Sequence, residues 1–321
     1  MSDTEITFRA AICDALDAAL AADPSVLVLG EDVAAAGGVW KTTPGLLERH
    51  GPQRVIDTPI SELALAGAAF GSAVCGKRPV VEIMFGDFLG LIMDSLVNQA
   101  AKWSFLSGGR VRVPLVVRSA VGAGGQFGAV HSQMPIAWFL GIPGLKIVCP
   151  STPADAGALL AAAILDDDPV LFLEHKRLYA TRGPAADSDA ELGRARILRA
   201  GSDVTLISVM RGVEECLAAA RTLAEQGCQA EVIDLRTIRP LDRAAVVGSA
   251  VRTGRVLVVE EGPRTGGWAA EVVATLVDEA LDQLETIGRL TCPDLPIPYS
   301  PPLEAAYLPG ADAIVEEVLA L

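Results

Sequence analysis

The stretch RVIDTPISELALAGAAFGSAVCGKRPVVEIM, residues 54–84, decides the fold of this chain. It contains a β-branched run at 54–57, a turn, a segment rich in alanine and glycine at 62–75, and a second apolar run at 79–84. Short runs of near-continuous hydrophobicity that are separated by helix-like segments are typical of a parallel sheet covered on both faces. This stretch therefore predicts one strand–helix–strand unit of an α/β domain.

The same alternation extends in both directions. In the first half, strands are expected at 26–30, 113–119, 145–149 and 169–173, and helices at 8–22, 88–106 and 153–166. A second unit has expected strands at 204–209, 230–235 and 255–261, and helices near 211–226, 241–252, 266–284 and 310–320. The fold class is therefore α/β with two doubly wound domains, at 1–180 and 201–321.

Two segments depart from this alternation. Residues 181–200 are polar and lack periodicity, which predicts an interdomain linker. The proline-rich run at 292–302 is expected to be extended and irregular.

Composition excludes several classes of protein. A net charge of −14 argues against nucleic acid or an anionic membrane as a partner, although it suits docking onto a basic protein surface. No apolar run reaches the roughly 18 to 20 residues of a membrane span. The acidic, amphipathic start of the chain differs from secretory and transit peptides, so a cytoplasmic location is expected. The six cysteines form no C-x-x-C pair, and buried free thiols are expected rather than disulfides or a zinc site.

Glu62 is the first candidate for chemistry. Thr58 could cap the following helix, and Pro59 suits a first helical position. By pattern alone, the favoured interpretation of Glu62 is an ordinary first-turn acid that the helix dipole stabilises. The alternative is a buried carboxyl group with a raised pKa, because the helix that follows has no polar face and should itself be buried.

Two further candidates follow expected strands. Phe88 lies at a strand–helix junction beside an exposed-looking Asp87, and ligands gather at the carboxyl ends of parallel strands. Phe85 is expected to be an ordinary core residue. The glycine-rich run VGAGGQFGAVHSQ, 121–133, predicts a loop that delivers His131, for which structural and acid–base roles are equally open. By themselves, these patterns indicate an α/β enzyme or enzyme subunit with a buried carboxylate.

Nine motifs together resemble a known family, namely the beta subunits of thiamine diphosphate-dependent 2-oxo acid dehydrogenases. That group includes the pyruvate, acetoin and branched-chain enzymes. The motifs run in order along almost the whole chain: GEDV (30–33), RVIDTPISE (54–62), PVVEIMFGDF (79–88), VNQAAKW (97–103), AVHSQ (129–133), PGLKIVCPSTPADA (143–156), DDPVLFLEHKRLY (167–179), VIDLRTIRPLD (232–242) and PYSPPLE (298–304). The resemblance implies a transketolase-type pyrimidine-binding domain followed by a transketolase C-terminal domain.

The resemblance also implies partners and roles. Two alpha and two beta subunits would share thiamine diphosphate, and a lipoyl-bearing acyltransferase core would take the acyl group. The alpha subunit would supply the magnesium site, which agrees with the lack of a G-D-G diphosphate motif here. Glu62 would contact the aminopyrimidine ring nitrogen and activate the cofactor. Phe88 would pack on the pyrimidine, His131 would assist acyl transfer to the lipoyl arm, and Glu31 would lie near the reacting centre.

A structural potassium site is the last implication of the resemblance. Its residues would be Leu115, Ala163, Ile164, Asp166 and Asp168, the last standing where some members have asparagine. By pattern alone, the run DDDPV at 166–170 either attracts a cation to the end of a helix or is solvated, and solvation is favoured.

The substrate class is expected to be pyruvate or acetoin, with a branched-chain 2-oxo acid as the alternative. A self-sufficient transketolase-like enzyme and a non-catalytic scaffold are the competing functions.

Overall fold

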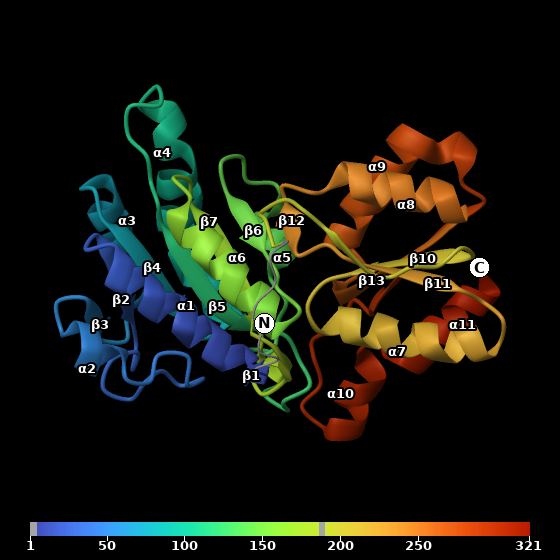
Figure 1. The fold of residues 1–321 in the computed structure, drawn as a ribbon, viewed down its shortest axis with the longest axis horizontal. Helices are drawn as coiled ribbons and strands as arrows, with labels where there is room; N and C mark the ends of the chain where they lie inside the picture. Colours follow the sequence, from blue (N-terminus) through green and yellow to red (C-terminus); the bar gives the residue numbers. More distant parts are fainter. Residues whose placement is uncertain (1–4, 186–189) are drawn as a thin grey trace.

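The structure, a computed structural model, describes residues 5–185 and 190–321. Residues 1–4, and residues 186–189 within the predicted linker, lie outside the described residues. Figure 1 shows two α/β units side by side, the first from the amino-terminal half and the second from the carboxy-terminal half. The predicted fold class, with two α/β domains, is confirmed.

The first domain is built on a seven-stranded sheet with the order β12-β6-β7-β5-β4-β2-β3. Its strands are β2 (Val26–Gly30), β3 (Val55–Asp57), β4 (Arg78–Ile83), β5 (Val116–Val121), β6 (Lys146–Val148), β7 (Val170–His175) and β12 (Thr237–Arg239). Neighbouring strands are parallel, except that β12 runs antiparallel to β6. The parallel strands are buried along most of their length, as their continuous hydrophobicity predicts.

Helices cover both faces of this sheet because crossovers between parallel strands are right-handed. The connections β3–β4 and β4–β5 move one way along the sheet, whereas β6–β7 moves the other way. Helices α1 and α6 therefore pack together on one face, and α3 lies with η1 and η2 on the other. The helical segments are α1 (Phe8–Ala22), α2 (Leu46–His50), α3 (Glu62–Val74), η1 (Gly86–Ile92), η2 (Asp94–Ala100), α4 (Ala101–Leu106), α5 (Ile136–Leu140), α6 (Pro153–Leu165) and η3 (Lys176–Leu178).

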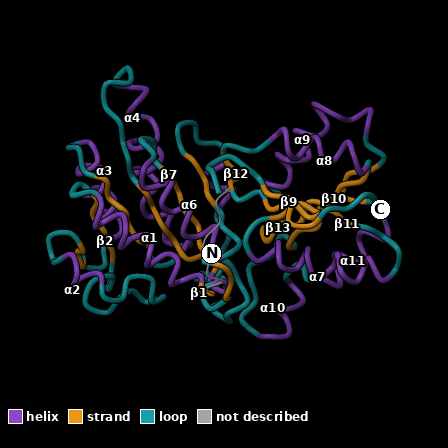
Figure 2. The backbone as a smooth tube through the Cα atoms, viewed as in Figure 1, coloured by secondary structure: helices purple, strands orange, loops and turns teal. Residues whose placement is uncertain are grey.

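The second domain has a five-stranded sheet with the order β14-β13-β10-β11-β9. Its strands are β9 (Arg196–Arg199), β10 (Val204–Ser208), β11 (Ala230–Asp234), β13 (Arg255–Pro263) and β14 (Thr286–Cys292). Figure 2 shows this sheet between two helical layers, α8 and α9 on one side and α7 and α11 on the other. The helical segments are α7 (Arg211–Glu225), α8 (Arg243–Thr253), α9 (Trp268–Ala280), η4 (Leu281–Gln283), α10 (Pro301–Tyr307) and α11 (Ala311–Ala320).

The two domains are joined by more than the chain between them. Strand β12 follows β11 of the second sheet but pairs with β6 of the first, so a segment after residue 200 completes the first sheet. Beside it, the Arg236 guanidinium forms an ion pair with Asp155 of α6 at 2.7 Å, and both side chains are almost completely buried. The predicted linker is regular at both ends, where β8 (Arg182–Pro184) pairs with β1 (Glu5–Thr7) and β9 pairs with β11.

Two expected segments differ from the structure, and strand β14 is among the elements that were not expected. The helix expected at 88–106 is a succession of 3-10, π and α turns, namely η1, η2 and α4. The proline-rich run at 292–302 does not stay irregular, because α10 begins at Pro301, where proline suits a first helical position. Strand β14 was not expected, since its residues are only half-buried and lack a clear alternation. Within the described ranges, no helix has both the length and the apolar character to cross a bilayer.

Candidate active site

The candidate residues gather at one edge of the first sheet. Glu31 directly follows β2, Phe88 follows β4, and the loop with His131 follows β5. These three strands are neighbours and parallel, so the residues after them emerge at the same edge. Glu62 begins α3, which follows β3 at the same edge. Parallel strand order thus brings together residues from four separate motifs.

Glu31 and Glu62 form a pair of carboxyl groups. Glu31 is half-buried, and burial raises its pKa, as do the charges of Glu62 and then Asp32, while the Ser61 N–H that donates to Glu31 opposes the rise. Its Oε1 atom is buried without a partner among the described residues. The carboxyl group of Glu31 therefore interacts electrostatically with that of Glu62 at this edge of the sheet.

Helix α3 is less buried than its sequence predicts. Only Leu65, Ala66, Ala69 and Ala73 are buried, and Glu62 itself is half-buried. The exposed fraction is 59% for Leu63 and 83% for Ile60. In this chain, the expected burial of the helix, and of the Glu62 carboxyl group with it, is therefore only partial.

The start of α3 also differs from the prediction. The residue before the helix is Ser61, whose side chain makes no capping bond, so neither Thr58 nor Pro59 has its expected role. Thr58 is instead tied by its N–H to the Gly30 carbonyl at 2.9 Å, and its hydroxyl is buried without a partner in the part of the chain that the structure describes. After Glu31 Oε1, the Thr58 hydroxyl is thus a second polar group that is available to a ligand at this edge.

An aromatic cluster forms the other side of the site. His131 packs edge-on against Phe85 and Phe88, with ring centroids 4.8 and 5.4 Å apart. Phe85, which was expected to be an ordinary core residue, is half-buried at the centre of this cluster and also contacts Trp40 and Phe127. The sequence analysis did not identify Trp40 and Phe127 as site residues. The only sequence feature that points to them is the scarcity of aromatic residues in this chain.

Asp87 and Lys176 hold the segment around His131. Asp87 accepts hydrogen bonds from the Gln133 backbone N–H and Nε2, at 3.3 and 2.9 Å, and is half-buried rather than exposed. Lys176 Nζ donates to the His131 carbonyl. Burial lowers the pKa of Lys176 to about 8, against the opposing effects of Asp87, Glu261 and Glu304. Lys176 was not singled out in the sequence, because its neighbours come from three distant segments.

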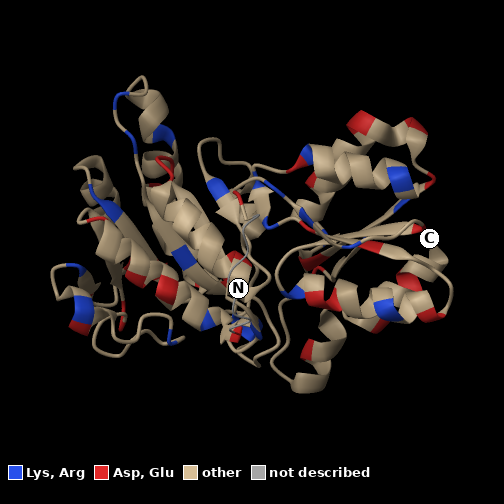
Figure 3. Ribbon diagram, viewed as in Figure 1, with Lys and Arg blue, Asp and Glu red and all other residues tan. Residues whose placement is uncertain are grey.

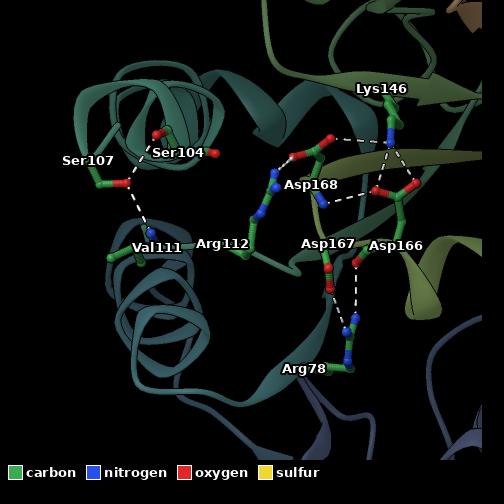
Figure 4. A network of polar contacts seen from close by, with 9 residues as sticks. All are labelled: Arg78, Ser104, Ser107, Val111, Arg112, Lys146, Asp166, Asp167 and Asp168. Atoms are coloured by element: carbon green, nitrogen blue, oxygen red, sulfur yellow. Dashed lines mark hydrogen bonds and ion pairs between the residues drawn. The ribbon is translucent and has the colours of Figure 1, made fainter. Parts of the chain in front are cut away.

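Of the residues predicted to bind potassium, Asp166 and Asp168 lie just beyond the end of α6, where the chain's own cations contact them (Figure 4). Arg78 Nη1 donates to the carbonyls of Ile164 and Asp166, both at 3.0 Å, and its Nη2 contacts Asp167 Oδ1 at 2.6 Å. Lys146 Nζ lies 2.6 Å from Asp166 Oδ2 and 3.4 Å from Asp168 Oδ2.

The remaining two oxygens of that predicted site are also bonded. The Leu115 carbonyl accepts from the Val170 N–H at 2.9 Å, and the Ala163 carbonyl accepts from the Asp166 N–H at 3.3 Å. A further cation here would have to compete with Arg78 and Lys146 for the same oxygens. The fit to potassium is therefore poor, and Arg78 and Lys146 supply the positive charge that the three aspartates attract.

Gly122 permits the tight path of the loop that carries His131. Its φ is +90°, and a Cβ at this position would lie 2.2 Å from Nε2 of His175, the atom that contacts Glu261 of the second domain. We expect Gly122→Ala to lower the free energy of unfolding by about 2 to 4 kcal/mol through overpacking and backbone strain. Gly248→Ala is the matched control, because Gly248 is helical with open space around it, and stability should rise slightly. Chemical denaturation of both variants tests this, and equal stabilities would contradict it.

The site fits the pyrimidine half of a thiamine diphosphate site. The aromatic rings of Phe88 and Phe85 offer packing surfaces, and the unpartnered Glu31 and Thr58 oxygens offer hydrogen-bond acceptors for ring nitrogen substituents. The sequence lacks the G-D-G motif for a diphosphate with magnesium. The described residues hold no cluster of three His, Cys, Asp or Glu side chains that could bind a metal.

Comparison with known proteins agrees with this architecture. Residues 4–182 match the family model of the transketolase pyrimidine-binding domain, and residues 193–314 match that of the transketolase C-terminal domain. The fold resembles a split-gene transketolase described as an inactive beta4 tetramer, with a TM-score of 0.82 and 24% identity over 98% of both chains. The predicted transketolase-type domain architecture is therefore confirmed.

Curated relatives are more similar in sequence. The beta subunit of acetoin:2,6-dichlorophenolindophenol oxidoreductase from Cupriavidus necator is 43% identical, over 97% of this chain and 95% of its own length. Its counterpart from Bacillus subtilis is 42% identical, over 98% and 97%. A mitochondrial pyruvate dehydrogenase subunit beta-1 from Arabidopsis thaliana is 43% identical, over 97% and 88%. The chain therefore belongs to the family of beta subunits of pyruvate- and acetoin-type 2-oxo acid dehydrogenases, which combine the transketolase pyrimidine-binding and C-terminal domains.

Proposed function

We propose that this chain works as one half of a thiamine diphosphate-dependent 2-oxo acid dehydrogenase of the pyruvate or acetoin type, in which two alpha and two beta subunits form a tetramer and bind the cofactor at the interface between alpha and beta. The main support for the proposal is the position of four residues at the same edge of the first sheet, namely Glu62, Glu31, Phe88 and His131. The names of the relatives support the substrate class, and branched-chain 2-oxo acids remain the alternative.

The residues of this chain would act on the pyrimidine end of the cofactor. Thiamine diphosphate, when bound, would supply a nucleophilic carbon for the substrate carbonyl and a cationic thiazolium ring as the acceptor of the electrons released on cleavage. Glu62 would hold a proton at the aminopyrimidine ring nitrogen, and Glu31, whose pKa is raised first by burial and then by the charge of Glu62, would lie beside it. Phe88 would orient the ring, and His131 would serve the transfer of the acyl group to a lipoyl arm.

An alpha subunit is expected on the exposed apolar surface beside Glu62. Ile60 and Leu63 of the α3 segment, Leu91 of η1, and Phe105 and Leu106 of α4 are each more than half exposed. These elements pack against one another through η2, and Figure 3 shows few charges along α3. Large exposed apolar side chains on adjacent elements mark protein interfaces. The alpha subunit would cover Glu62, supply the diphosphate and magnesium site, and provide the desolvation that this chain lacks.

Docking to a lipoyl-bearing acyltransferase core is also part of the proposal, and it rests on the family alone. A cytoplasmic location is proposed as well.

Reconstitution tests the proposal. The isolated chain should neither bind thiamine diphosphate tightly in calorimetry nor turn over, whereas addition of its alpha subunit, magnesium and cofactor should restore activity toward pyruvate or acetoin. Branched-chain 2-oxo acids are the comparison substrates. Cofactor binding and turnover by the isolated chain would instead indicate a self-sufficient, transketolase-like enzyme.

A further inference from the structure

The loop that carries His131 has little structure of its own. Between β5 and α5 the backbone adopts positive φ at Gly122, Gly124, Gln126 and Gly128. Such alternation turns successive N–H groups outward to one side and forms a concave site that attracts negative groups. The histidine ring makes edge-on contacts with two phenylalanines, and the position of its backbone depends on what holds the loop.

Two carboxylates of the second domain hold the outward N–H groups. Glu304 of α10 accepts from the N–H groups of Gly124 at 2.9 Å and of Gln126 at 3.2 Å. Glu261 of β13 accepts from the Ala123 N–H at 2.6 Å and contacts His175 Nε2 at 2.9 Å. Glu304 is only 4% exposed, so water competes little for these bonds. Hydrogen bonds to a buried ionised acceptor are strong and directional.

The other end of the loop is held by the first domain. Lys176 Nζ donates to the His131 carbonyl while lying 5.4 and 5.1 Å from the ring centroids of Phe85 and Phe127. Its ammonium also interacts electrostatically with Glu261 and Glu304. The loop is therefore held at both ends: carboxylates accept from its N–H groups at 123–126, and an ammonium donates to the His131 carbonyl.

We infer that Glu304, together with Glu261, is a positioning residue for His131, through which the second domain controls acyl transfer to the lipoyl group. The inference rests on the proposed function, because it assigns the second domain a part in that reaction. Glu304 lies 173 residues beyond His131 in sequence and acts through the loop backbone, so it touches no reacting atom.

The length of the side chain at 304 should matter more than its charge. Oε1 accepts from both Gly124 and Gln126, and Oε2 also accepts from Gln126 at 3.2 Å. A glutamine keeps the two bonds to Oε1 and loses the one to Oε2, whereas an aspartate is too short and a leucine cannot accept. In the reconstituted tetramer, acyl transfer to a lipoyl domain should fall by about 10- to 100-fold in Glu304→Leu, since displacement of a catalytic group by about 1 Å costs up to 100-fold. The expected order of rates is wild type, Glu304→Gln, Glu304→Asp and Glu304→Leu.

A dye that accepts electrons directly provides the second readout, because it bypasses the lipoyl arm. Dye reduction should stay within about 3-fold of wild type in all three variants, and the exposed Glu316→Leu of α11 should leave both rates unchanged. An equal fall in both rates, or an aspartate variant that outperforms glutamine, would overturn the inference.

Hydrogen exchange on the full-length chain separates this inference from the proposed function. The amides of residues 123–126 should exchange faster in Glu304→Leu than in Glu316→Leu, whether or not the tetramer is active. Unchanged exchange would refute the positioning role of Glu304, whereas a wild-type tetramer that reduces neither dye nor lipoyl domain would refute the proposed function.

Discussion

Replacing Glu62 with glutamine is expected to lower the turnover of the reconstituted tetramer by at least about 100-fold, with assembly intact. The amide is nearly the same size as the carboxylate but cannot take up and return a proton at the cofactor ring, and positioned acid–base groups contribute about 10²- to 10⁴-fold. Steady-state rates with saturating cofactor, together with the sedimentation of the tetramer, provide the measurement.

Glu271→Gln is the matched control for this substitution. Glu271 is also a first-turn glutamate, but it lies exposed on α9 of the second domain. If the helix dipole were all that mattered at Glu62, the two variants would lose similar small amounts of stability and no activity. Normal turnover by the Glu62→Gln tetramer would refute the central role of Glu62.

The pKa of Glu31 should change in the Glu62→Gln variant, and this change can be measured without any assay of activity. Burial raises the pKa of Glu31 first, and the charge of Glu62 adds to the rise. Removing that charge should therefore lower the Glu31 pKa, which carboxyl-selective NMR titration of the isolated chain can follow.

The sequence predicts the regular elements well wherever local pattern is decisive. Helix α1 at Phe8–Ala22 and strand β2 at Val26–Gly30 lie where the sequence places them, because their hydrophobic periodicity is strong. Strand β12 was missed because three residues carry no pattern, and their pairing with β6 depends on how the two domains meet. Non-local contacts of this kind override intrinsic preference.

The site residues likewise fall into those that local motifs predict and those that depend on contacts distant in sequence. Strand ends place Glu31, Phe88 and His131 at one edge of the sheet, so motif and topology suffice for them. Lys176 and Glu304 were missed because each acts on a loop far away in sequence. The burial of Glu62, which was the alternative interpretation of its motif, is partial in this chain, and composition alone does not indicate how far an apolar helix is covered.

Arg118→Met should cause the largest loss of stability. Arg118 is 1% exposed in the middle of the first sheet, where it bonds Glu174 through Nε at 2.7 Å and Glu82 through Nη1 at 3.0 Å. Removing the cation leaves two carboxyl groups without their partner in a dry core, which costs about 3 to 5 kcal/mol. The thermal midpoint of the chain should fall by roughly 6 to 20 °C. Arg112→Met is the control, since Arg112 is mostly exposed and lies 3.9 Å from Asp168.

The pH dependence of this loss identifies its cause. Burial raises the pKa of Glu174 above its ordinary value, and Arg118 opposes that rise. Without Arg118 the folded-state pKa rises further, so stability decreases as pH increases from the unfolded pKa, near 4.5, up to the new folded value. The gap between wild type and Arg118→Met should therefore be smaller at pH 5 than at pH 8. Adding Glu174→Gln should recover part of the loss at pH 8, because one unpaired charge is removed. A gap that is independent of pH would indicate that lost packing, rather than the unpaired carboxylates, destabilises the variant.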